Sequence, residues 1–244
     1  MDGLFSHVHE ATIRTLAVNG YAVEEVPAQV CCGALHAHAG LRREAKALAG
    51  RNVEAFASEG VDAIVSHSAG CGAALREAGH LLEDGPLAAK ASSFSARIRD
   101  VSEILAEVGL PEPPAAASAP PRNGGGSRPL RVTYHDACHL AHGQKVREAP
   151  RRLLRALPGV EFVELPNSDW CCGSAGIYNL SHPDMAEAQL GPKLDSVAKV
   201  APDVVVASNP GCLLHMRRGA VARGERAEML HLVELLGRVY PPGV

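Results

Sequence analysis

Short runs of apolar residues alternate with longer amphipathic segments along most of this chain. Apolar residues at helical spacing predict helices over residues 6–18, 42–58, 88–108, 183–198 and 230–239, and a further helix that ends near residue 154. Short apolar runs predict buried strands over residues 22–26, 61–65, 130–135, 161–165 and 204–206. Strands that alternate with helices are typical of an α/β fold, in which helices cover both faces of a mostly parallel sheet.

One stretch, residues 111–129, departs from this pattern because proline, glycine, alanine and serine dominate it. Such a composition cannot build a hydrophobic core and is typical of a linker. It predicts a first domain over residues 1–110 and a second over residues 130–244. A chain of 244 residues is long enough for two domains of roughly 100–150 residues.

The two halves carry the same cysteine landmarks at a nearly constant spacing. A Cys-Cys-Gly triplet begins at Cys31 and again at Cys171, 140 positions later, and Cys71 and Cys212 are 141 positions apart. A shared offset between landmarks of one type indicates a duplicated unit. The second half has a further cysteine, Cys138, 33 positions before its triplet, and the matching position would precede residue 1. We therefore expect two tandem Rossmann-like domains, of which the first lacks its N-terminal strand and leading cysteine.

Composition excludes several classes of function. The net charge of −3 leaves no basic footprint for nucleic acid, and no apolar run approaches the ~20 residues of a membrane span. The first residues lack the basic and apolar regions of a signal peptide, so we expect a cytoplasmic protein. Cysteines stay reduced in that compartment, and their count of seven is odd. Both points favour metal ligands or redox groups over a disulfide framework.

Four cysteines of the second half follow predicted strands, where a parallel sheet gathers its loops in one crevice. They are Cys138, Cys171, Cys172 and Cys212. Converging thiolates select an iron–sulfur cluster or zinc. Adjacent cysteines hinder a single-ion tetrahedral site, whereas a cluster offers several iron atoms, so the pattern favours an iron–sulfur cluster, which we expect to be of the 4Fe-4S type. By the repeat, a site with three thiols is expected in the first half, formed by Cys31, Cys32 and Cys71.

The expected geometry is specific. We predict that the sulfurs of Cys138, Cys172 and Cys212 lie within about 8 Å of one another, with Cys171 at the rim. Three polar residues are expected to line the same crevice, where they could tune a bound cofactor. These cofactor-binding candidates are His135, His139 and Asn209.

Other interpretations of these residues stay open. The cysteines could be small buried apolar side chains, zinc ligands in a non-enzymatic assembly module, or the paired thiols of a thiol–disulfide reductase. The histidines could hydrogen-bond the backbone or face solvent. Trp170, the only tryptophan, is predicted to pack, and Arg151 and Arg152 are predicted to lie on a solvated helix face.

The residues around the cysteines resemble the cysteine-rich CCG domain, which recurs in tandem in heterodisulfide reductase B-type subunits and in the iron–sulfur subunit of glycolate oxidase. The likeness to the glycolate oxidase subunit covers nearly the whole chain. It rests on residues 31–36, 69–74, 134–144, 172–179 and 209–212.

This resemblance implies an iron–sulfur electron-transfer subunit, or a fragment of one. A partner subunit with FAD would oxidise glycolate or a similar 2-hydroxy acid, with peripheral membrane association through the complex left open. No Gly-x-Gly-x-x-Gly fingerprint opens either domain and no catalytic constellation stands out, so we expect the chain alone to be inactive.

The sequence also departs from these relatives. The family's N-terminal ferredoxin-like part is absent from this sequence. Ser68 and Asn209 stand where the heterodisulfide reductase pattern has a further cysteine, three positions before Cys71 and Cys212. The missing thiolate argues against that relative's non-cubane cluster and disulfide chemistry.

Overall fold

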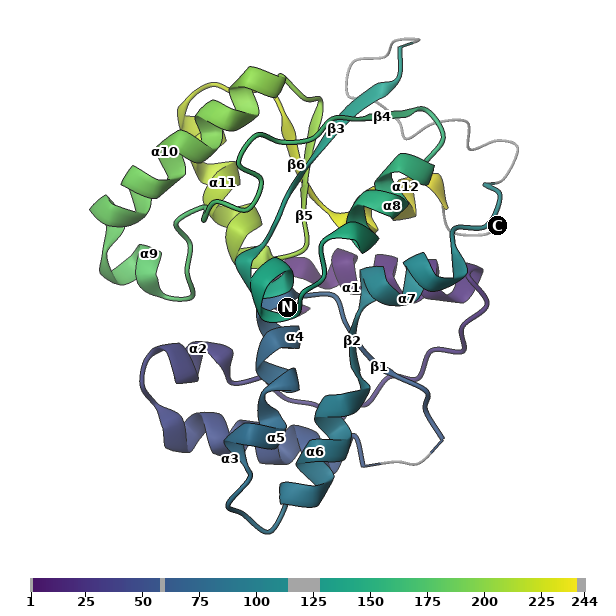
Figure 1. Ribbon diagram of the computed structural model, residues 1–244, viewed down its shortest axis with the longest axis vertical. Helices are drawn as coiled ribbons and strands as arrows, with labels where there is room; N and C mark the ends of the chain where they lie inside the picture. The colour runs from purple at the N-terminus through teal and green to yellow at the C-terminus, as the bar shows by residue number, and fades with distance from the viewer. Residues whose placement is uncertain (1, 58–59, 114–127, 241–244) are drawn as a thin grey trace.

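The computed structural model describes residues 2–57, 60–113 and 128–240. In these residues, helices alternate with strands that form two parallel sheets, which confirms the α/β fold (Figure 1). The strands are β1 (Ile64–Ser66), β2 (Ile98–Asp100), β3 (Leu130–His135), β4 (Val160–Phe162), β5 (Val204–Ala207) and β6 (Glu228–His231).

The helices of the first half are α1 (Asp2–Val18), α2 (Ala34–His38), α3 (Arg42–Ala55), α4 (Ala69–Arg76), α5 (Ala78–Leu81), α6 (Ala88–Arg97) and α7 (Val101–Val108). Those of the second half are the π-helix η1 (His139–Gly143), α8 (Glu148–Ala156), α9 (Tyr178–Ser181), α10 (Pro183–Val200), α11 (Pro210–Ala222) and α12 (Leu232–Val239). None of the helices in the described ranges is long and apolar enough to cross a membrane.

The larger sheet belongs to the second half and has the strand order β4-β3-β5-β6, with every pair parallel. Its central strand β5 is buried along its whole length, as expected for a strand with both faces covered. In Figure 1, α10 and α11 cover one face and α8 and α12 the other. Because the strands are parallel, the C-terminal ends of β3, β4 and β5 meet at one edge of the sheet.

The smaller sheet pairs β1 with β2, with Ile64 opposite Ile98. The order β1, α4, β2 and α7 in the first half repeats the order β5, α11, β6 and α12 in the second. In the second half β3 pairs with the remaining edge of β5, whereas among the described residues β1 pairs with β2 alone. The structure therefore contains the duplicated unit that the cysteine spacing predicts.

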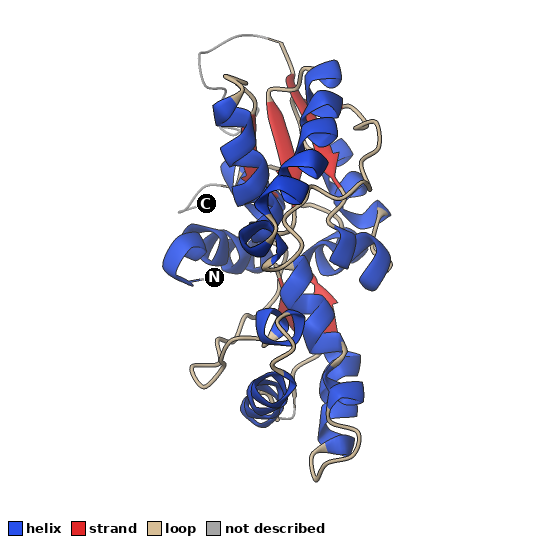
Figure 2. Cartoon of the chain, turned by 90° about the vertical axis from the view of Figure 1, so that its left-hand side faces the viewer, coloured by secondary structure: helices blue, strands red, loops and turns tan. Residues whose placement is uncertain are grey.

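The two halves share the larger of the two hydrophobic cores in the described residues; the smaller one, around Val53, Ile64 and Phe94, belongs to the first half alone. Helix α1 of the first half packs on α12 of the second, and α8 of the second half packs on α7 of the first. Phe5 and Val8 of α1 accordingly belong to the same buried cluster as Leu235 and Leu236 of α12. Figure 2 shows the larger sheet above the smaller one, with helices between them. Most of the predicted linker, residues 114–127, lies outside the described residues.

Three sequence predictions about these elements are wrong. Residues 22–26 form no strand. Their counterpart in the repeat is β4, which is held in the sheet by pairing with β3. The described first half has no strand equivalent to β3, so residues 22–26 have no partner to pair with. The predicted helix over residues 88–108 is interrupted by β2, and β6 occupies the start of the helix predicted over residues 230–239. Both strands are only three or four residues long and run directly into a helix, so helical spacing conceals them.

Candidate metal centre

The four cysteines of the second half, which we name the second site, lie in loops at one edge of the larger sheet. Cys138 follows β3, Cys171 and Cys172 follow β4, and Cys212 lies in the first turn of α11, shortly after β5. Since β3 pairs in parallel with both β4 and β5, their three following loops leave the same edge. The order of strands in the sequence predicts this convergence.

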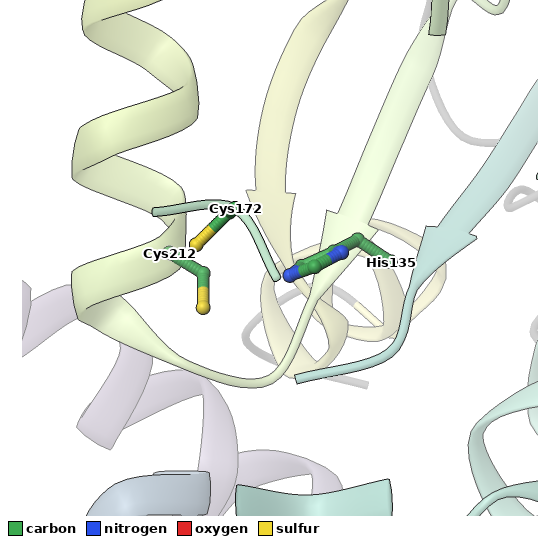
Figure 3. Close-up of side chains that lie close together, drawn as sticks. All are labelled: His135, Cys172 and Cys212. Atoms are coloured by element: carbon green, nitrogen blue, oxygen red, sulfur yellow. The ribbon is translucent and has the colours of Figure 1, made fainter. Parts of the chain in front are cut away.

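At the centre of the second site, His135 at the end of β3 faces Cys172 and Cys212 (Figure 3). One ligand atom from each of these residues lies within 4.8 Å of the other two. The three side chains are buried, and neither ring nitrogen of His135 makes a hydrogen bond of ordinary geometry. Soft sulfur ligands beside a buried imidazole fit the chemistry of a transition-metal site.

The four thiols interact in a row that runs from Cys138 through Cys171 and Cys172 to Cys212, each affecting the pKa of its neighbour. The Cys138 thiol donates to Cys171 and lowers the pKa of Cys171 well below its usual range. The Cys172 thiol donates to Cys212 and lowers the pKa of Cys212, which the His135 ring lowers further. Metals bind thiolates, so these shifts favour the form of Cys171 and Cys212 that a metal would require.

The polar residues expected at this site are also near it. The side-chain Nδ2 of Asn209 donates to the sulfur of Cys212 at 3.3 Å, and His139 Nδ1 lies 3.8 Å from the sulfur of Cys138. Burial, and then the neighbouring His38 ring, lower the pKa of His139. Asn209 is the N-cap of α11, so the positive end of that helix faces the thiols as well.

A glycine lets the triplet loop of the second site pass close beneath α10. Gly173 has a φ of +92°, and a Cβ on it would lie 2.3 Å from the main-chain oxygen of Ala186. In the first half, a Cβ on Gly33, with a φ of +83°, would lie 3.3 Å from the oxygen of Ala45. Both backbones adopt a conformation that side chains disfavour, and the second site is the more tightly packed.

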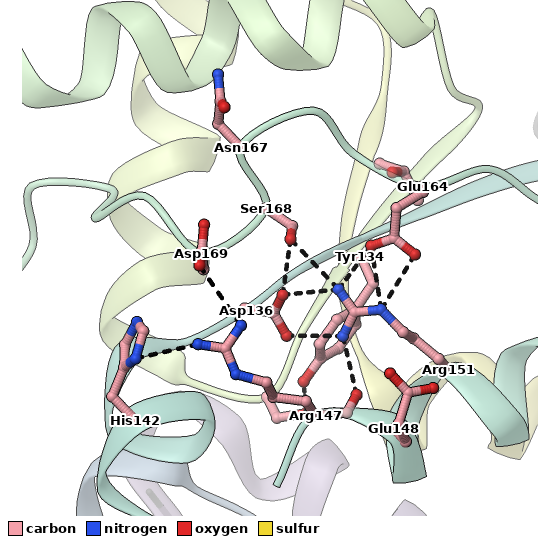
Figure 4. A network of polar contacts seen from close by, with 12 residues as sticks. Tyr134, Asp136, His142, Arg147, Glu148, Arg151, Glu164, Asn167, Ser168 and Asp169 are labelled. Carbon is pink, nitrogen blue, oxygen red and sulfur yellow. Dashed lines mark hydrogen bonds and ion pairs between the residues drawn. The ribbon is translucent and has the colours of Figure 1, made fainter. Parts of the chain in front are cut away.

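A buried ion pair fixes the loops that carry Cys138 and the triplet (Figure 4). The Arg151 guanidinium donates two hydrogen bonds to Asp136, at 2.8 and 2.7 Å, and others to Glu164. Ser168 donates to the same Asp136 carboxylate at 2.7 Å, and so joins the β3 and β4 loops. Although burial opposes it, this pairing lowers the pKa of Asp136. The ordering of these loops therefore depends on a charge pair two residues from Cys138.

The sequence did not predict this ion pair. Arg151 was expected on a solvated helix face, but its side chain is only 8% exposed. Trp170, which was expected to pack, is 54% exposed beside Cys171. Arg151 is buried because Asp136 and Glu164 come from other segments of the chain. The available signal was Asp136 itself, a carboxylate directly after an apolar strand.

The cysteines of the first half, which we name the first site, gather less completely. Cys71 lies in the first turn of α4, after β1, in the position that Cys212 has in α11. The Cys32 thiol donates to Cys71 and, with the nearby Ser68, lowers the pKa of Cys71 to about 6 despite burial. Cys31 is exposed to solvent. The structure thus brings Cys32 and Cys71 into contact and leaves Cys31 at the surface.

The two sites face each other across the boundary between the halves. Asn209, whose Nδ2 donates to Cys212, also accepts a hydrogen bond at 3.2 Å from the main-chain N–H of Gly70, the neighbour of Cys71. The rings of His38 and His139 lie 5.4 Å apart between centroids. One amide side chain therefore connects the loops of both sites.

Two parallel sheets with cysteine-rich loops at equivalent edges define an α/β protein built from a cysteine-rich repeat. A family described as the CCG cysteine-rich domain matches residues 1–76 and 132–217, more than half of the chain. The chain belongs to this family, and the resemblance seen in the sequence is confirmed.

Curated relatives cover the chain almost completely. It is 37% identical to the "Probable glycolate oxidase iron-sulfur subunit" of Bacillus subtilis (strain 168). The 239 aligned residues are 97% of this chain and 52% of that protein. It is 33% identical to one of the subunits of the "Fumarate reductase (CoM/CoB)" of Methanothermobacter marburgensis, over 94% of this chain and 42% of that protein. It is 30% identical to "Lactate utilization protein A" of Geobacillus kaustophilus, over 97% of this chain and 94% of that protein. The chain spans about half the length of the first two relatives.

Proposed function

We propose that this chain is an iron–sulfur electron-transfer subunit, or part of one, in a complex that oxidises a 2-hydroxy acid. The observation that carries the proposal is the row of four thiols in the second site, with two sulfurs and an imidazole within 4.8 Å at its centre. Glycolate and lactate, which occur in the names of two relatives, are both 2-hydroxy acids. A partner subunit with FAD would remove the hydride, and this chain would pass on single electrons.

The residues of the second site fit a cluster of the 4Fe-4S type. Cys138, Cys171, Cys172 and Cys212 would hold it. A cluster bound there would supply one-electron transfer at a potential set by its surroundings. Asn209 would keep its hydrogen bond to the Cys212 sulfur, and the burial of Cys172 and Cys212 would limit the access of water. Cys31, Cys32 and Cys71 would form a second, less complete binding site.

Metal and sulfide analysis tests the proposal most directly. Anaerobically purified protein should contain iron and acid-labile sulfide, and its visible absorption should bleach on reduction. Protein that is free of metal but exchanges disulfides would instead support a thiol–disulfide reductase. Zinc alone would support a structural zinc module, which the compact His135, Cys172 and Cys212 group would also accommodate.

A kinetic experiment tests the role of the partner. The purified chain alone should not reduce an artificial dye with glycolate or lactate, because we assign it no substrate-oxidising residues. Turnover by the isolated chain would contradict the proposal that it is an electron-transfer subunit. A cytoplasmic location, with peripheral membrane association through the complex, stays a prediction from the sequence.

A further inference from the structure

Helix α10 buries a lysine behind the second site. Lys193 is 1% exposed, and its Nζ donates to the main-chain oxygens of Asn167 and Ser168 at 2.6 and 3.1 Å. These oxygens belong to the loop that leads into Cys171 and Cys172. The buried neighbours of Lys193 on this part of α10 are the apolar Leu190, Leu194 and Val197 and one small polar residue, Ser196. The lysine therefore occupies a position that the helical pattern assigns to the core.

Among the described residues, the charge of Lys193 has no carboxylate in direct hydrogen-bond contact. Both hydrogen bonds of its ammonium group go to carbonyl oxygens, which carry only partial charge. Burial lowers the pKa of Lys193, and the cysteines of the second site, with the carboxylates of Asp136 and Asp169, oppose that shift. Asp136 already has Arg151 as its ion-pair partner. A buried cation is costly unless a nearby anion compensates it, and thiolates or a bound anionic cluster at the second site would supply that compensation.

The first half offers an internal comparison for this position. Ala45 on α3 and Ala186 on α10 occupy equivalent places, since each main-chain oxygen lies above the glycine of a triplet. Seven residues later along these helices come Asn52 and Lys193. Both are buried, at 2% and 1% exposure.

Asn52 holds its triplet loop by hydrogen bonds alone. Its Oδ1 accepts from the main-chain N–H of Val30 at 2.9 Å, and its Nδ2 donates to the oxygen of Cys31 at 3.1 Å. A neutral amide is therefore sufficient to tie the loop to the helix. The positive charge of Lys193 is therefore not needed to hold the loop, and we look for its effect on the cysteine site instead.

We propose that Lys193 is an electrostatic positioning residue that raises the reduction potential of a cluster held by Cys138, Cys171, Cys172 and Cys212. The inference rests on the proposed function. Reduction adds a negative charge to a cluster that its thiolates already make anionic, and a fixed buried cation stabilises the reduced form more than the oxidised one. The first site, with Asn52 in the same place, lacks this contribution.

The test measures the midpoint potential of the reconstituted protein by redox titration with electron paramagnetic resonance detection. Lys193→Gln keeps a donor for the carbonyls of Asn167 and Ser168 but removes the charge. The reduction equilibrium of the second-site cluster should shift at least about tenfold toward the oxidised form, which is about 59 mV for one electron. Lys193→Arg, which keeps the charge, should stay within about twofold of the wild type. The matched control is Lys199→Met on the exposed side of the same helix, which should also leave the potential unchanged.

The outcomes separate the two proposals. A wild-type chain that binds no iron or sulfide contradicts the proposed function, and the inference falls with it. A wild-type cluster whose potential is the same in Lys193→Gln overturns the inference alone. If Lys193→Gln does not fold, Lys193→Met, which leaves no unpaired polar group in the apolar pocket, takes its place with the same expectation. A purely structural lysine would change thermal stability in these variants without moving the potential.

Discussion

The first and second sites share a frame but differ in what completes it. In both, a cysteine in the first turn of a helix, Cys71 or Cys212, meets a triplet loop from the preceding segment. The second site adds β3, which brings Cys138 and His135 to the same edge, and the Arg151 ion pair that orders the loops. Within the described residues, the first site is built on two strands only.

This difference shows that the repeat supplies geometry while the added residues supply the chemistry. The hydrogen bonds between loop and helix occur in both halves, through Asn52 in one and Lys193 in the other. In the described structure only the second site has a fourth thiol and two fully buried cysteines, Cys172 and Cys212. We therefore expect the two sites to respond unequally to equivalent changes.

The largest difference should appear when one cysteine is removed from each triplet. Cys172→Ser should remove more bound iron than Cys32→Ser, because Cys172 is buried and interacts with two other thiols at the centre of a four-thiol site. Iron and sulfide per chain, measured after anaerobic reconstitution of both variants, provide the comparison. Equal losses would mean that the two sites hold their clusters equally firmly.

An alanine at the glycine of each triplet should separate the sites by packing. A side chain at a positive φ costs about 1–2 kcal/mol, which we expect for Gly33→Ala. Gly173→Ala should cost about 2–4 kcal/mol of the free energy of unfolding, because its Cβ would meet the Ala186 oxygen at 2.3 Å and displace α10. Urea unfolding measures both values.

Gly224→Ala is the control for backbone strain in this experiment. Gly224 has a φ of +70°, and a Cβ on it would have no atom within 4 Å. Its substitution isolates the cost of the backbone conformation from the cost of the clash. If Gly173→Ala destabilises the chain no more than Gly224→Ala does, the triplet loop of the second site is not tightly packed beneath α10.

The smallest effects concern two buried helix caps at equivalent positions, Asp100 before α7 and His231 before α12. Burial raises the pKa of Asp100 to about 6 and lowers that of His231 to about 3. As the pH falls below about 6.5, the unfolded chain protonates the histidine and the folded chain does not, so His231 removes stability. Asp100 acts in the opposite direction, because its stabilising contribution is lost as the pH rises from about 3.8 to about 6.

Asparagine at either position keeps a side-chain oxygen for the cap and removes the titration. Between pH 7 and pH 5, His231→Asn should therefore lose about 1–2 kcal/mol less free energy of unfolding than the wild type. Asp100→Asn should lose about 1–2 kcal/mol more over the same interval. Urea unfolding of the metal-free, reduced protein at the two pH values checks both signs. Parallel pH profiles for all three proteins would show that these caps do not titrate as their burial requires.

The sequence by itself determined the elements and landmarks that depend on local pattern. The run of apolar residues at 130–135 predicts β3 with its observed bounds, and the spacing of the cysteines predicts the duplicated unit. The convergence of the three cysteine loops also follows from the sequence, because parallel strands must place their C-terminal ends together. These features needed only apolar periodicity and the order of strands and helices.

Only the tertiary structure decided how charged side chains and short strands are partnered. Arg151 is buried because Asp136, 15 positions away, is there to pair with it, and Lys193 is buried because carbonyls 25 and 26 positions earlier accept its hydrogen bonds. The strands β2 and β6 exist through pairing with β1 and β5, and α1 is covered by α12 of the other half. Burial of a charge and formation of a three-residue strand are both unfavourable unless a distant segment supplies the partner, so no local pattern could reveal them.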